Sequence, residues 1–211
     1  MSTLIDYAEC AKLGVATIYE AAGRAGLIDI SFEQLIPRSR VAGPARTVRN
    51  AQGDNLMVHA VIERIVPGEI VVLTMPEPAP VALIGDLLVT QIMKAGAAGV
   101  LVDASVRDAE ELATMGLPIW ARWVRVRGAT KNAVGELDIP VTVGGCTIAP
   151  GDLVVLDADG ACAIPQARVD EVIVAARKRA ATEAANRERY AAGEHSYDIN
   201  NLRQVVLAAS K

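Results

Sequence analysis

The sequence predicts an α/β fold, because short apolar runs with strand character alternate with segments of helical periodicity along the chain. Two further observations favour a single domain over residues 1–211. The chain is long enough to bury a sizeable core, and no linker, repeat or low-complexity segment divides it. Its hydrophobic content of 52% includes only 3% aromatic residues, so we expect an aliphatic core.

The expected elements follow from hydrophobic periodicity and from turn residues. The helices are expected over residues 3–13, 15–25, 54–66, 85 to about 95, 108–115 and 167–191. The strands are expected over residues 41–49, 69–75, 98–102, 120–127, 141–144, 153–157 and 161–164. Three prolines in the segment Met75–Pro80 fix φ and remove backbone donors, which predicts a stiff loop before the helix that begins near Gly85.

The strongest functional signal lies at two predicted strand-to-helix junctions. Gly85-Asp86-Leu87-Leu88 opens one helix, so its first N–H groups lack partners inside the helix and favour an anion. Strand 98–102 is expected to end before Asp103, and Arg107-Asp108 begins the next helix. An anionic substrate suits the amides and the arginine, whereas a hard divalent cation suits the carboxylates. The stretch therefore indicates a metal-assisted enzyme that acts on a small carboxylic acid.

Each residue also has an ordinary explanation. Asp86 would be a first-turn acid, Asp108 a helix cap, and Arg107 a solvated partner of Glu110 or Glu111. For any one of them alone, local cap chemistry is the better explanation. Their joint placement favours a site.

The paired signature, with Asp86 and Asp108 separated by 22 positions, resembles that of the RraA-like family. Within the family it is most similar to class II pyruvate aldolases that cleave 4-hydroxy-4-methyl-2-oxoglutarate and 4-carboxy-4-hydroxy-2-oxoadipate. The resemblance covers most of the chain, including residues 17–23, 53–59, 150–157 and 178–183. It implies a swivelling β/β/α fold with N-terminal helices, a helical C-terminal extension over residues 167–211, and assembly into homotrimers or homohexamers.

The resemblance also implies roles for individual residues. Asp108 would bind Mg²⁺, with Mn²⁺ as the alternative, and Glu183 of a neighbouring subunit would complete the outer metal shell. The amides of Gly85, Asp86, Leu87 and Leu88 would hold the pyruvyl carboxylate. Arg107 would stabilise the enolate at the 2-oxo oxygen, and Asp86 would order water at the cation and take part in proton transfer. Because oxaloacetate decarboxylation forms the same enolate, that activity should accompany the aldolase.

The chain departs from the family pattern near the site and in the C-terminal tail. Ser105 stands where a glycine is usual, which is a small change. Asn200 stands where the aldolases usually carry an aromatic residue, and the tail beyond Arg203 is short. The identity of the acceptor half of the substrate therefore stays open, whereas the resemblance still implies a pyruvyl group for the other half.

Two other functions compete with the aldolase. Some RraA-like proteins bind and inhibit ribonuclease E, but the C-terminal helix with Glu183 argues against that role here. A methyltransferase, a name the family has carried, would need a strand followed by a Gly-rich turn and a ribose-binding acid, which this chain lacks.

Composition excludes several classes of protein. The net charge of −4 argues against a nucleic-acid surface, and no apolar run reaches membrane-spanning length. Because the N-terminus lacks a basic region followed by an apolar core, we expect a cytoplasmic protein. The three cysteines, Cys10, Cys146 and Cys162, are odd in number and widely spaced, so we expect reduced thiols.

Other polar residues keep two interpretations each. Arg122, Arg125 and Arg127 alternate along a predicted strand and form either a carboxylate or subunit contact, or a solvated strand face. His59 either supports the site from behind or is a packed, satisfied histidine. The position of Glu20 relative to the site is open.

Overall fold

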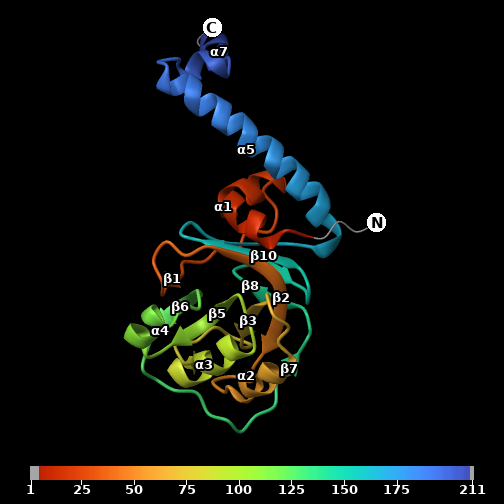
Figure 1. Ribbon diagram of the computed structural model, residues 1–211, viewed down its shortest axis with the longest axis vertical. Coiled ribbons are helices and arrows are strands. Elements are labelled where there is room, and N and C mark those ends of the chain that lie inside the picture. Colours follow the sequence, from red (N-terminus) through yellow and green to blue (C-terminus); the bar gives the residue numbers. More distant parts are fainter. Residues whose placement is uncertain (1–4, 210–211) are drawn as a thin grey trace.

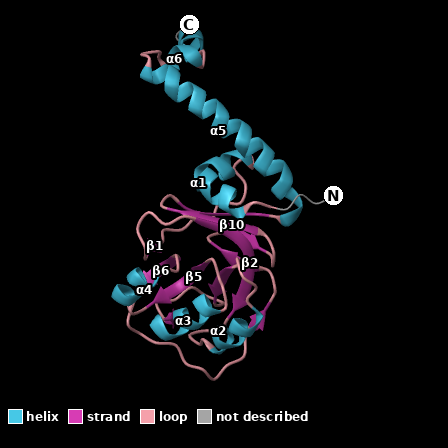
Figure 2. Cartoon of the chain, viewed as in Figure 1, coloured by secondary structure: helices cyan, strands magenta, loops and turns pink. Residues whose placement is uncertain are grey.

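The computed structural model describes residues 5–209 (Figures 1 and 2). The strands of the main sheet are β1 (Glu33–Gln34), β2 (Val41–Arg49), β3 (Ile70–Thr74), β4 (Ala82–Ile84), β5 (Gly99–Val106), β6 (Ile119–Val124), β7 (Glu136–Leu137), β10 (Leu153–Asp157) and β11 (Gly160–Ile164). A separate hairpin consists of β8 (Val141–Val143) and β9 (Cys146–Ile148). The helices are α1 (Tyr7–Ala21), α2 (Leu56–Val61), α3 (Asp86–Lys94), α4 (Ala109–Met115), α5 (Val169–Ala191), α6 (Ser196–Ile199) and α7 (Leu202–Ala209). Short 3₁₀ turns cover Ile62–Arg64 and Gln166–Arg168.

The sheet has the strand order β1-β6-β5-β3-β2-β10-β11, with β4 beside β5 and β7 beside β2. Strands β2, β3, β5 and β6 run parallel, because a crossover containing a helix joins each to the next. Strand β2 joins the two halves of the curled sheet. Its residues 41–44 pair antiparallel with β10, whereas residues 45–49 pair parallel with β3.

Three apolar clusters fill the spaces between the layers. Helices α2, α3 and α4 cover one face of the parallel strands, over a cluster that includes Val71, Val102 and Ile92. Helices α1 and α5 cover β10 and β11 from the other end of the molecule (Figure 2). The third cluster lies within the curl, where the indole Nε1 of Trp120 donates to the carbonyl of Asp157 at 2.9 Å.

The mixed α/β fold and the long C-terminal helix are confirmed. Strand 41–49 has the predicted bounds, and the predicted break between two N-terminal helices appears as a kink in α1 at Gly14, where φ is +82°. The carboxylate of Asp157 accepts the Val15 N–H at 2.8 Å and so restarts the helix after the kink. Residues 5–6 are not helical, and the predicted start at residue 3 lies outside the described residues.

Several predicted boundaries are wrong. The strand expected to end at Val102 continues to Val106, and the strand expected over 120–127 ends at Val124. The loop before Gly85 contains β4, which was not predicted, because its three apolar residues follow directly on a proline-rich segment. The edge strands β1 and β7, the strand β9, and the helices α6 and α7 were also missed.

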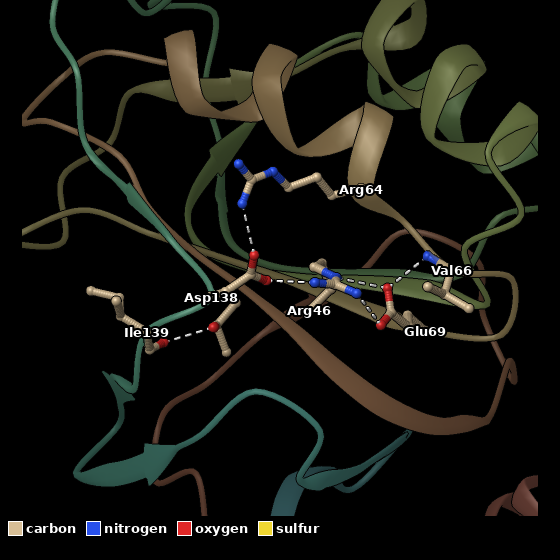
Figure 3. A network of polar contacts seen from close by, with 7 residues as sticks. Arg46, Arg64, Val66, Glu69, Asp138 and Ile139 are labelled. Atoms are coloured by element: carbon tan, nitrogen blue, oxygen red, sulfur yellow. Dashed lines mark hydrogen bonds and ion pairs between the residues drawn. The ribbon is translucent and has the colours of Figure 1, made fainter.

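A network of charged side chains fastens β2 to its neighbours (Figure 3). Arg46 donates to both carboxylate oxygens of Glu69, at 2.9 and 2.7 Å, and to Asp138 at 2.5 Å. Arg64 donates to the other oxygen of Asp138 at 3.1 Å. Burial alone would raise the pKa of Asp138, but the hydrogen bonds from Arg46 and Arg64 outweigh it and lower the pKa. The network holds the start of β3 and the segment after β7 against β2.

Helix α5 extends away from the sheet and carries α6 and α7 at its far end (Figure 1). We refer to residues 169–209 as the C-terminal arm. Cys10, Cys146 and Cys162 are buried and unpaired, in agreement with the predicted free thiols. In the described part of the chain, no helix combines the length and apolar character needed to cross a bilayer.

Candidate active site

The site forms where β4 and β5 end. Gly85 follows β4 and precedes α3, while Arg107 and Asp108 follow β5 and precede α4. Because β4 and β5 are parallel neighbours, both junctions lie at the same edge of the sheet. The two predicted junctions are thus brought together.

Asp108 occupies the position before α4 but does not cap that helix with its side chain. Its backbone is left-handed, with φ +58° and ψ +43°, a conformation that aspartate tolerates better than most residues. Its Oδ2 instead accepts the backbone N–H of Asp86 at 3.2 Å. The carboxylate therefore reaches the start of the neighbouring helix α3. A role as the cap of α4 would not account for this contact.

This contact depends on glycine at position 85. A Cβ built on Gly85 would lie 2.2 Å from Oδ2 of Asp108, well inside van der Waals contact. The contact also changes the predicted amide cradle, because the N–H of Asp86 is already bonded to Asp108. The N–H groups of Leu87 and Leu88 follow in the first turn, where no carbonyl of the helix can accept them.

Arg107 lies across the entrance to the same junction. Its Nε is 3.5 Å from Oδ2 of Asp108, and half of its side chain is exposed. Its Nη1 lies 3.1 Å from the place where Gly128 would carry a Cβ, so the guanidinium rests against a glycine backbone. Its recorded ion pair is with Asp108, rather than with Glu110 or Glu111 as in the ordinary explanation.

A cavity of about 230 Å³ lies over the start of α3. It is lined by the predicted residues Gly85, Asp86, Leu87, Leu88 and Arg107, together with Asn55, His59, Ala82, Leu83, Ile84, Gln91, Ala129 and Lys131. Asp108 adjoins Gly85 beside the cavity. The arrangement offers an anion the α3 amides, one guanidinium and one ammonium group.

Lys131 was missed by the sequence analysis, because it lies in a segment without periodicity that β6 and β7 flank. Asp54 holds this segment in place. Its Oδ2 accepts the Thr130 hydroxyl at 2.6 Å and the N–H groups of Asn132 and Ala133 at 2.7 and 3.2 Å. Burial alone would raise the pKa of Asp54, but these hydrogen bonds and one from the Leu56 N–H lower it to about 2.

Replacing Asp54 with alanine is expected to release the Lys131 segment and to destabilise the fold by about 1–2 kcal/mol at neutral pH. Because the folded pKa is depressed, this stabilisation is complete above the ordinary pKa near 4 and is lost as the pH falls toward 2. Thermal melting at pH 7 and at pH 3 measures it, with Asp159→Ala on an exposed turn as the control. An equal loss at both pH values would contradict the proposed electrostatic origin.

Asp103, which follows the predicted strand 98–102, is not part of the site. Because β5 continues through residue 106, Asp103 points away from the face that α3 covers, on which Val102 and Ala104 lie. It is buried and paired with Arg122 at 2.6 Å. Arg122 also lies 5.3 Å from the ring centre of Trp123.

The three arginines predicted to share one strand, Arg122, Arg125 and Arg127, lie in different surroundings. Arg122 is occupied by Asp103, and its side chain is largely buried. Arg125 and Arg127 lie beyond the end of β6 and are exposed. The three arginines therefore do not form one cluster on a single strand.

Glu183 lies on α5 of the C-terminal arm. Figure 1 shows α5 leading away from the sheet and from α3, whose first residues line the cavity. Glu183 pairs with Arg179 at 2.9 Å, and Arg179 in turn lies 4.0 Å from Glu20 on α1. Asn200 shares a groove on the arm with Glu183. Glu20, Glu183 and Asn200 thus lie on the arm side of the molecule, away from Asp108.

The donor set near Asp108 fits a magnesium-type cation only in part. Within residues 5–209, no three His, Cys, Asp or Glu side chains come together as a ready-made metal site. The start of α3 does place the partly exposed carboxylate of Asp108 beside the residue that carries a second one, Asp86. Mg²⁺ commonly uses one or two carboxylates and keeps several waters, so Asp108 and its neighbour would supply part of the cation's shell and water the rest.

A family model for RraA-like proteins, described as Aldolase/RraA, matches residues 15–163. The chain belongs to the RraA-like family. The match covers the second half of α1, all the parallel strands and the junctions that carry Gly85 and Asp108. The family predicted from the paired signature is thereby confirmed.

Individual relatives carry different names. A Halalkalibacterium halodurans protein provisionally named 4-hydroxy-4-methyl-2-oxoglutarate aldolase is 35% identical over 159 residues, which is 75% of each chain. The structure of Streptomyces coelicolor RraAS2, described as an unusual member of the RNase ES inhibitor RraA family, matches with a TM-score of 0.74 at 29% identity, over 88% of this chain and 98% of that one. A Geobacillus kaustophilus structure named S-adenosylmethionine: 2-dimethylmenaquinone methyltransferase matches with a TM-score of 0.61 at 28% identity, over 65% and 84%.

Proposed function

We propose that this RraA-like chain is a class II, divalent-cation-dependent pyruvate aldolase. Its substrates would be 4-hydroxy-2-oxo acids such as 4-hydroxy-4-methyl-2-oxoglutarate or 4-carboxy-4-hydroxy-2-oxoadipate, and oxaloacetate decarboxylation would be a side activity. The observation that carries the proposal is the convergence of the α3 amides, Arg107 and the Asp108 carboxylate at one edge of the sheet, beside a cavity. The aldolase name of the Halalkalibacterium relative supports it.

In this proposal each group performs one step of binding or charge stabilisation. The N–H groups of Leu87 and Leu88 bind the carboxylate of the pyruvyl half, aided by the positive end of the α3 dipole. Arg107 donates to the 2-oxo oxygen. Asp86 lines the same cavity and takes part in moving the proton. Asp108 would hold Mg²⁺ or Mn²⁺, with Asp86 ordering the water bound to it, and the cation would supply a Lewis acid for the developing oxyanion.

The bond changes account for this arrangement. The proton leaves the 4-hydroxyl, the C4–O bond becomes a carbonyl and the C3–C4 bond breaks. Its electron pair forms the C2–C3 double bond, which leaves a pyruvate enolate with its negative charge on the 2-oxo oxygen. Arg107 is partly buried against Gly128, where a fixed positive charge stabilises that oxygen more than it would in water.

Lys131 raises a mechanistic alternative, because a lysine in an aldolase cavity can form a Schiff base. A Schiff-base lysine is normally activated by desolvation or by a neighbouring cation. Lys131 is exposed, and its side chain makes no hydrogen bond or ion pair with any residue of the described range 5–209. We assign it a charge-pairing role toward the second carboxylate of the substrate.

The test is a coupled assay for pyruvate release from 4-hydroxy-4-methyl-2-oxoglutarate, its 4-carboxy adipate relative and oxaloacetate. Activity should need Mg²⁺ or Mn²⁺ and disappear with EDTA. Borohydride added with pyruvate should not inactivate the protein. Failure on all three substrates in the presence of metal would contradict the aldolase, and trapping by borohydride would contradict the metal-dependent class.

A regulatory role is the second candidate, favoured by the similarity to RraAS2 over nearly its full length. The regulatory role would be distinguished from the aldolase if the protein inhibited an RNase E-type ribonuclease and released no pyruvate. The methyltransferase name of the Geobacillus relative has no matching Gly-rich turn in this sequence.

The position of Glu183 leads to a prediction about assembly. Because the arm carries Glu183 away from its own cavity, we propose that it completes the cation site of a neighbour in a homotrimer or homohexamer. Glu183→Ala should then weaken metal use, while mixing its subunits with Asp108→Ala subunits should restore part of the activity. Native mass spectrometry verifies the exchange of subunits. No recovery despite exchange would place both residues in one chain's site or leave Glu183 without a role.

A further inference from the structure

Two polar residues that line the cavity have no role in binding the pyruvyl half of the proposed substrate. Asn55 precedes α2 and His59 lies one turn later, so both side chains occupy the same side of the helix, and both line the cavity. Four residues of the described chain have a buried side-chain polar atom without a hydrogen-bond partner, namely Asn50, Asn55, His59 and Ser105. Of these, Asn55 and His59 line the cavity.

The orientation of the Asn55 amide follows from its contacts. Its Nδ2 donates to the carbonyl of Leu83 at 2.8 Å, and its backbone N–H donates to the carbonyl of Thr130 at 2.9 Å. Exchanging the amide N and O would bring two oxygens together at Leu83, so the unpaired atom is the acceptor Oδ1. Leu83 lies in β4, which leads directly to Gly85. Asn55 is therefore tied to the strand that positions the α3 amides.

An unpaired buried acceptor carries an energetic cost that a ligand can remove. Oδ1 can only accept, so it is complementary to a hydroxyl and repels a carboxylate. The Nε2 atom of His59 accepts or donates according to the tautomer of the ring. The carboxylates of a substrate have other partners in the same cavity, namely the α3 amides, Arg107 and Lys131. A neutral hydroxyl is the substrate group left for Asn55 and His59.

We infer that Asn55 and His59 form the binding subsite for the hydroxyl on the carbon that leaves with the second product. This rests on the proposed function and names the residues that recognise the 4-hydroxyl of its substrates. Both residues line the cavity, and Oδ1 of Asn55 and Nε2 of His59 are their buried atoms without a partner. The hydroxyl donates to Oδ1, and Nε2 contacts the same oxygen.

The test compares a substrate that has the hydroxyl with one that lacks it. In Asn55→Ala and in His59→Leu, kcat/KM for cleavage of 4-hydroxy-4-methyl-2-oxoglutarate should fall by about 10²-fold. Oxaloacetate decarboxylation should fall far less, by about threefold or under, because oxaloacetate carries no hydroxyl for the subsite to bind. His59→Gln places an amide nitrogen near the position of Nε2 and should recover part of the cleavage.

Two matched variants separate binding from stability. Asn50 has the same chemistry as Asn55, since its Nδ2 donates to the Thr74 carbonyl at 3.1 Å and its Oδ1 is buried and unpaired, but it does not line the cavity. Asn50→Ala should lower the melting temperature about as much as Asn55→Ala, without the selective loss of cleavage. His195→Leu, at the other histidine, which is exposed on the arm, should change neither reaction.

The inference would be overturned if Asn55→Ala or His59→Leu lowered both reactions equally, or lowered neither. It would also be overturned if Asn50→Ala showed the same selective loss of cleavage. In these cases the wild-type protein still releases pyruvate, so the proposed function stands. A wild-type protein inactive on both substrates would overturn the proposed function and this inference together.

Discussion

Asp108→Asn is expected to abolish metal-dependent pyruvate release while leaving the fold intact. Asparagine adopts the left-handed backbone of position 108 as readily as aspartate and preserves the side-chain shape, so the variant removes the charge alone. A neutral amide binds a hard divalent cation much more weakly than a carboxylate does. Isothermal titration with Mn²⁺ measures the loss of cation binding directly, and the coupled assay measures the loss of turnover.

Glu110→Gln is the matched control, because Glu110 is an exposed acid on the first turn of α4 and neutralising it leaves Asp108 in place.

Gly85→Ala is a second way to weaken cation binding at Asp108. Its Cβ would push against Oδ2 of Asp108 without removing any donor, so metal binding should weaken although both carboxylates remain. Full Mn²⁺ affinity in Asp108→Asn would refute the assignment of this carboxylate.

The sequence allowed the fold and part of the site to be predicted, and Asp103 shows where such prediction fails. The apolar run that predicts strand 98–102 stops at Val102, and a carboxylate such as that of Asp103 is costly to bury without a partner. Arg122, on the adjacent strand, compensates that charge at 2.6 Å, so β5 continues and Asp103 turns away from the cavity. Pairing between residues this far apart in sequence leaves no local pattern.

Distance along the chain also explains the residues that were missed. Gly85, Arg107 and Asp108 were found because each belongs to a local strand-to-helix junction with a recognisable pattern. Asn55 and Lys131 reach the same cavity through contacts such as the hydrogen bond from Asn55 to Leu83 and the Asp54 anchor. Neither contact is marked in the sequence by a hydrophobic periodicity or by turn residues. The separation of Glu183 from the cavity likewise depends on the direction in which α5 leaves the sheet, which residue patterns do not encode.

Arg107→Ala is expected to lower kcat by about 10²–10³-fold if its guanidinium stabilises the enolate oxygen, in line with the loss of one oxyanion donor. Arg107→Lys keeps a positive charge but loses the planar fork, and the ammonium cannot rest against Gly128 as the guanidinium does. We therefore expect the lysine variant to fall between the wild type and the alanine variant. Arg125→Ala removes an exposed arginine from the segment after β6 and serves as the control.

The division of the effect between kcat and KM identifies the step at which Arg107 acts. The negative charge on the 2-oxo oxygen develops only as the C3–C4 bond breaks, so a donor aimed at that oxygen contributes more in the transition state than in the bound substrate. Loss of that donor lowers kcat for oxaloacetate and for the 4-hydroxy substrate by similar factors, since both pass through the same enolate. A variant in which KM alone rises would show that Arg107 binds the substrate carboxylate, and would move the stabilisation of the enolate to the cation at Asp108.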